Sequence, residues 1–119
     1  MTSEQFIKIR NLIEKEFSHA VTKHPKFADL FTNPRTDWAR LERTMKREND
    51  ENAPPYYAEN ILLEEVAEAF NAYSKGDLKN ALHEFAQVGA VAMRCMDYVM
   101  EKMDENAKLA KNHLQNIQK

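Results

Sequence analysis

The sequence predicts an all-α protein, a bundle of four main helices followed by a weak C-terminal helix or tail. The chain of 119 residues contains only two glycines and four prolines. It is rich in Glu, Lys, Ala, Leu and Met, which favour helices. Apolar residues also recur at intervals of three and four along much of the chain, as on one face of a helix. The length is typical of a single domain, residues 1–119.

The first helix is predicted over residues 3–21, where Thr2 and Gln5 can form a capping box at the start. Its apolar face consists of Phe6, Ile9, Ile13, Phe17 and Ala20. Pro25 interrupts this pattern, so residues 25–36 are predicted to be a connection with room for a short helical turn.

Two further helices are predicted over residues 37–50 and 55–75. Pro55 suits the first position of a helix, because its missing N–H group would be unpaired there in any case. Gly76 is suited to end the third helix, and Asp77 to cap the next one. Because this turn is so short, the third and fourth helices are expected to be antiparallel neighbours.

The fourth helix is predicted over residues 78–103, and residues 104–119 form the polar tail. The predicted buried stripe of this helix consists of Leu78, Leu82, Phe85, Gly89, Ala92, Met96 and Val99. The tail carries few apolar residues, so it is expected either to dock weakly or to fray.

The composition argues against several classes of partner. The net charge is −2 with 30% charged residues, whereas nucleic-acid binding requires an electropositive surface, so no nucleic-acid polymer is expected. No apolar run is long enough to cross a bilayer, so no membrane is expected. A single cysteine, Cys95, and an N-terminus without a signal peptide's apolar stretch indicate a cytoplasmic location.

Acidic residues crowd the third helix within the segment ILLEEVAEAF, residues 61–70. At about 100° per residue, Glu65 lies about 70° and Glu68 about 130° from the centre of the buried stripe, with Glu64 nearly opposite it. No Lys or Arg occurs between residues 47 and 75 to neutralise them.

The fourth helix repeats this arrangement. Glu84 lies about 100° and Gln87 about 160° from its stripe, on the same side. Across an antiparallel pair, these flanks are expected to bring Glu65, Glu68, Glu84 and Gln87 to one groove.

Three carboxylates in one groove repel one another. Two unit charges 4 Å apart cost about 4 kcal/mol at an effective dielectric constant near 20. A hard divalent cation would relieve this repulsion, and Mg²⁺ prefers oxygen ligands. The sequence therefore predicts a Mg²⁺ site, which Mn²⁺ could also fill. The alternative is a solvated helix face whose carboxylates form salt bridges across an oligomer.

The pattern Glu65-x-x-Glu68 followed by Glu84-x-x-Gln87 resembles the MazG-like all-α nucleoside triphosphate pyrophosphohydrolases over about residues 61–99. The resemblance implies a homodimer or homotetramer that uses Mg²⁺ to hydrolyse an NTP or dNTP to NMP and pyrophosphate. It also implies that Glu65, Glu68 and Glu84 are catalytic metal ligands, one of which could orient the attacking water. The family's last acidic position is Gln87 here, whose carbonyl can bind Mg²⁺ without adding charge.

Several polar residues near this groove are candidates for binding substrate phosphates or the nucleoside. They are Arg94, Lys75, Asn80, Lys46 and Arg47. Each is also an ordinary residue of a helix surface or helix end. The alternative function is a catalytically silent helical module of the same fold that oligomerises or binds a nucleotide or protein.

Overall fold

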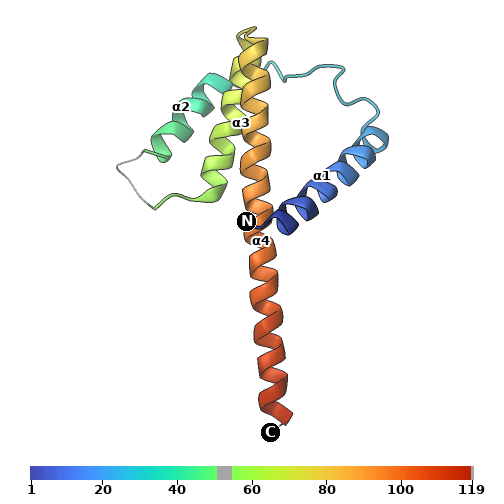
Figure 1. The fold of residues 1–119 in the computed structure, drawn as a ribbon. Helices are drawn as coiled ribbons and strands as arrows, with labels where there is room; N and C mark the ends of the chain where they lie inside the picture. Colours follow the sequence, from blue (N-terminus) through green and yellow to red (C-terminus); the bar gives the residue numbers. More distant parts are fainter. Residues whose placement is uncertain (51–54, 119) are drawn as a thin grey trace.

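The computed structural model describes residues 1–50 and 55–118 of the chain. It contains helices α1 (Ser3–Lys23), α2 (Trp38–Glu48), α3 (Ala58–Ser74) and α4 (Leu78–Gln118) (Figure 1). No β-strand occurs in either described segment. The predicted all-α class and the four main helices are therefore confirmed.

Helices α3 and α4 form the antiparallel hairpin that the sequence predicts (Figure 1). Gly76 adopts a left-handed conformation with φ of 80°. This conformation lets the Gly76 and Asp77 N–H groups donate to the carbonyls of Tyr73 and Ala72 at the end of α3. Asp77 then caps α4, because its Oδ1 accepts from the Asn80 N–H at 3.2 Å. This turn fixes which residues of α3 and α4 face each other.

Helix α2 packs on α3, and aromatic side chains fill the space at one end. Trp38 stacks on Phe70 with ring centroids 4.7 Å apart, and Phe70 contacts Phe85 edge to face at 5.1 Å. Phe31, from the connection between α1 and α2, lies 4.4 Å from the Tyr73 ring. These contacts join α2, α3 and α4 through one apolar cluster.

Several predicted boundaries differ from the structure. Helix α3 begins at Ala58, three residues after Pro55, and α2 ends at Glu48, where the Asn49 N–H donates to the Met45 carbonyl. The connection between α1 and α2 contains turns but no helix. The capping box at the start of α1 is confirmed, because the backbone N–H groups and side chains of Thr2 and Gln5 bond reciprocally.

The largest error concerns the C-terminal tail, which continues α4 without a break to Gln118 instead of stopping near residue 103. The sequence from residue 90 onward contains no Gly or Pro, so nothing in it terminates a helix. Every described side chain from residue 101 to 117 is exposed. The second half of α4 thus projects away from the rest of the chain (Figure 1).

A compact bundle of all four helices is not what the structure shows. Helix α1 diverges from the other three and contacts only α4 (Figure 1). Within α1, Ile9 is fully buried, but Phe17 is 71% exposed. The predicted apolar face of α1 is therefore only partly covered within one chain.

The predicted buried stripe of α4 is also partly wrong. Leu82 is 75% exposed and Leu78 63% exposed, whereas Ala81 is buried. Ala81 is buried and Phe85 contacts Phe70 of α3, so the side of α4 that faces α3 is offset from the side that the spacing favoured. Among the described helices, none combines the length and hydropathy that a membrane span requires.

Candidate metal centre

The structure brings together the three glutamates that the sequence singled out. Glu65 and Glu68 lie one turn apart on α3, and Glu84 faces them from α4. One carboxylate oxygen from each lies within 4.8 Å of the other two. All three side chains are half-buried, so the cluster opens to solvent from the groove between the two helices.

The electrostatics of this cluster show that its negative charge lacks compensation. Burial raises the pKa of Glu68 to about 8, together with a hydrogen bond to Glu84 and the charges of Glu65, Glu84 and Glu64. Burial, followed by repulsion from Glu84 and Glu64, also raises the pKa of Glu65. The three carboxylates are hard oxygen donors, and ionising all of them at once is unfavourable. A divalent cation binds such donors and would favour their charged forms.

Gln87 completes the cluster from α4, one turn beyond Glu84. Its neighbours determine the orientation of its amide. The Nε2 group donates to Glu65 Oε2 at 3.0 Å and to Glu84 Oε2 at 2.8 Å, while the amide oxygen accepts from His83 Nε2 at 3.2 Å. Sequence reasoning expected the carbonyl of Gln87 to face the metal, but here its N–H groups face the carboxylates.

Glu64 and His83 are two neighbours of the cluster whose contributions the sequence analysis did not identify. Glu64, expected opposite the buried stripe, is half-buried, and its charge raises the pKa of both Glu65 and Glu68. His83 is exposed and fixes the amide of Gln87 by the contact described above. The spacing of four between His83 and Gln87 is the signal that could have paired them.

Arg94 lines a groove of about 290 Å³ that begins one turn from the acidic cluster. Ile61 precedes Glu65 by one turn of α3, and Val91 follows Gln87 by one turn of α4. Both belong to the groove wall, which consists of Ala58, Ile61, Val91, Arg94, Cys95, Tyr98 and Val99. The groove therefore extends the α3–α4 interface away from the hairpin turn.

The remaining candidates lie elsewhere. Lys75 and Asn80 are exposed near the hairpin turn, on the opposite side of the acidic cluster from Arg94. Arg47 is exposed on α2. Lys46, also on α2, forms an ion pair with Glu42 at 3.4 Å. The structure therefore does not gather these four residues and Arg94 around one point.

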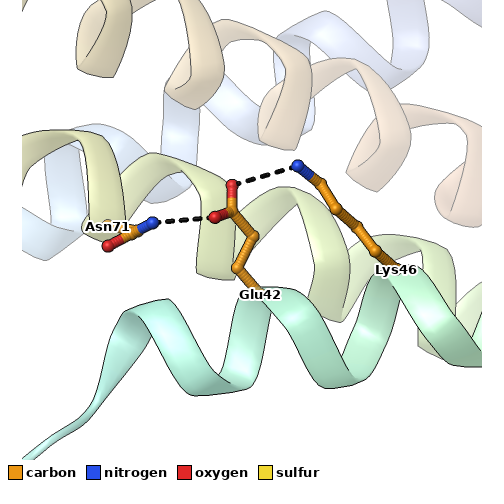
Figure 2. A network of polar contacts seen from close by, with 3 residues as sticks. All are labelled: Glu42, Lys46 and Asn71. Carbon is orange, nitrogen blue, oxygen red and sulfur yellow. Dashed lines mark hydrogen bonds and ion pairs between the residues drawn. The ribbon is translucent and has the colours of Figure 1, made fainter.

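Sequence reasoning missed the polar link between α2 and α3. Asn71, which is 5% exposed, donates from Nδ2 to Glu42 Oε2 at 2.7 Å, and the second oxygen of Glu42 pairs with Lys46 (Figure 2). The signal was an Asn one turn beyond Glu68, at a position inside a helix where propensity favours other residues. This link fixes α2 against the helix that carries Glu65 and Glu68.

The chain matches no protein-family model, no characterised protein and no solved structure among those to which it was compared.

Proposed function

We propose that the chain is a Mg²⁺-dependent nucleoside triphosphate pyrophosphohydrolase with a MazG-like helical fold, converting an NTP or dNTP to NMP and pyrophosphate. The single observation that carries this proposal is the convergence of Glu65, Glu68 and Glu84 within 4.8 Å across two helices. The proposal includes a cytoplasmic location and a homodimer or homotetramer.

In this mechanism Glu65, Glu68 and Glu84 hold the cation, with Mn²⁺ as a possible substitute. When bound, Mg²⁺ neutralises triphosphate charge and increases the acidity of bound water. One of the three carboxylates would orient the water that attacks the α-phosphorus.

In this mechanism Gln87 would position the carboxylates without adding charge to the site. Its two N–H groups bond to Glu65 and Glu84, so it holds one oxygen of each residue in place and leaves the other oxygen for the cation. A rotation of the amide would instead present the carbonyl as a neutral ligand.

Substrate placement follows the direction of the groove. Arg94 lies seven residues beyond Gln87 on α4, about 10 Å along the helix axis. This separation allows a triphosphate held at the glutamates to reach the Arg94 guanidinium, a bidentate partner for phosphate oxygens. Ile61 and Val91 offer an apolar wall between them. Lys75, Asn80, Lys46 and Arg47 are weaker candidates, because they lie outside this groove.

A second candidate function is a catalytically silent helical module that oligomerises or binds a nucleotide or protein. Two observations favour it: Gln87 contributes no charge to the cluster, and the second half of α4 exposes apolar side chains. The two candidates differ in whether the glutamates support turnover.

Product analysis with a panel of NTPs and dNTPs in the presence of Mg²⁺ tests the proposal. The informative pair is Glu65→Ala and Glu59→Ala, since Glu59 is an exposed glutamate of the same helix, outside the cluster. NMP and pyrophosphate should form with the unmodified chain and with Glu59→Ala, but not with Glu65→Ala. Equal turnover by both variants would remove the cluster from the mechanism, and no turnover by any form would favour the silent module.

A further inference from the structure

The second half of α4 packs against no other helix in the described part of the chain. Every side chain from residue 101 to 117 is exposed, whereas helices in proteins gain most of their stability from packing of an apolar face. The whole chain exposes 9799 Å², whereas a folded monomer of 13.9 kDa is expected to expose roughly 6,700 Å². The excess is larger than the roughly 800 Å² that each chain buries in a stable complex.

Apart from Leu109, the apolar residues from Met100 to Ile117 follow a heptad repeat. Their spacing alternates regularly between three and four residues, which is the pattern of a two-helix coiled-coil seam. This distal seam consists of Met100, Met103, Ala107, Ala110, Leu114 and Ile117. Helix α1 contacts α4 near Met96, where a shallow groove lies between the two helices. The chain's own α1 therefore leaves the distal seam uncovered.

We propose that the distal seam binds the distal seam of a second copy of this chain in an antiparallel coiled coil. Small residues lie at its centre, Ala107 and Ala110, and large ones at both ends. In the antiparallel arrangement, Met103 packs against Leu114 of the second copy, and Met100 packs against Ile117. The twofold axis then passes between Ala107 and Ala110, where the two helices approach most closely.

Charge determines the direction of the second helix. Asp104 and Lys111 occupy equivalent positions beside the seam, one heptad apart, and neither forms an ion pair in the described part of the chain. Antiparallel pairing places Asp104 of each copy beside Lys111 of the other, which gives two ion pairs. Parallel pairing in register instead places Asp104 beside Val99 and Lys111 beside Asn106. It gives none.

This inference does not depend on the chemistry at Glu65, Glu68 and Glu84. The surface that it assigns to self-association is the distal seam, which lies several turns from the acidic cluster along α4. It also places the α2–α3 units of the two copies at opposite ends of the paired helices, so both acidic clusters remain open.

The first test compares two leucine substitutions on the same helix by light scattering over a dilution series. Leu114 lies in the distal seam and is 58% exposed, while Leu109 lies outside it and is 66% exposed. Leu114→Glu should halve the assembly mass of the unmodified chain, and Leu109→Glu should leave it unchanged. A monomeric unmodified chain, or equal effects of both changes, would overturn the proposal.

The second test addresses direction and does not depend on whether Leu114→Glu folds. Asp104→Lys and Lys111→Asp should each weaken association, and the double variant should restore it. In a Cys95→Ser background, Met100→Cys mixed with Ile117→Cys should form a crossed disulfide on oxidation. Disulfides between two copies of Ile117→Cys, or no rescue by the double variant, would contradict antiparallel pairing.

Discussion

Glu68 and Glu84 face each other across the groove between α3 and α4 and share a hydrogen bond between their carboxyl groups. Such a bond requires that one of them keep a proton. Burial and this bond raise the pKa of Glu68 to about 8, so Glu68 keeps its proton at neutral pH in the metal-free protein.

The stability of the metal-free protein should fall as the pH rises from about 5 to 8. The unfolded chain releases the Glu68 proton near 4.5, and the folded chain near 8. Between these values the folded state binds more protons, so its stabilisation is complete below the lower value and lost through the higher one. Urea denaturation at a series of pH values, with EDTA present, measures this slope.

Glu68→Gln is the informative variant for this slope, because a neutral amide retains hydrogen-bonding ability without titrating. Its pH dependence should be flatter than that of the unmodified chain. Glu59→Gln, at an exposed site on the same helix, should keep the original slope. A slope that is the same in all three proteins would show that Glu68 does not hold the proton.

Adding Mg²⁺ or Mn²⁺ should raise the thermal unfolding temperature. A ligand that binds only the folded state at 100 times its Kd stabilises by about 2.7 kcal/mol. Because cation and protons compete for the same oxygens, the shift should be larger at pH 8.5 than at pH 6.5. Differential scanning fluorimetry measures it.

The control for metal binding is Glu84→Gln, which removes charge from α4 but keeps a side chain of similar size. It should abolish most of the cation-dependent shift, whereas Glu101→Gln, an exposed position outside the cluster, should preserve it. A shift that survives Glu84→Gln would place the cation elsewhere.

Gln87→Glu should have opposite effects on stability and on metal affinity. The substitution removes the donors to Glu65 and Glu84 and adds a fourth carboxyl group to the cluster. The metal-free protein should be destabilised by roughly 1–3 kcal/mol, while Mg²⁺ should bind more tightly. Calorimetric titration gives the affinity, and urea denaturation gives the stability.

Gln87→Ala separates these two effects, since it removes the donors without adding charge. It should lower the stability of the metal-free protein but give no gain in affinity. If Gln87→Glu and Gln87→Ala bind Mg²⁺ equally, charge at this position does not control the site.

The acidic cluster could be predicted because it depends on local rules. Gly76 and Asp77 specify a tight turn, and a tight turn fixes how α3 and α4 face each other. Helical rotation then places Glu65, Glu68 and Glu84 on facing flanks. The orientation of the Gln87 amide could not be predicted, because it depends on a hydrogen bond with His83 that two tautomers and two amide orientations allow.

The rest of the fold depends on contacts between distant residues, and there the sequence was less informative. Asn71 and Glu42 are 29 positions apart, and no periodicity relates them. Helix α4 was predicted to end near residue 103 because its hydropathy falls there. The absence of Gly and Pro after residue 90 was the better indicator. The position of α1 could not be predicted either, because part of the apolar face of α1 is not covered within one chain.

Removing the amide of Asn71 should destabilise the fold more than removing the Lys46 ammonium, although both groups contact Glu42. Asn71 is buried, so Asn71→Ala leaves the facing carboxylate oxygen without its donor and should cost about 1–3 kcal/mol. The Lys46 side chain is 55% exposed, so Lys46→Ala should cost less than about 1 kcal/mol. Combining each with Glu42→Ala, which removes both acceptor oxygens, in a double-mutant cycle read by urea denaturation should give a larger coupling for Asn71. Equal couplings would mean that the link between α2 and α3 depends on packing rather than on this hydrogen bond.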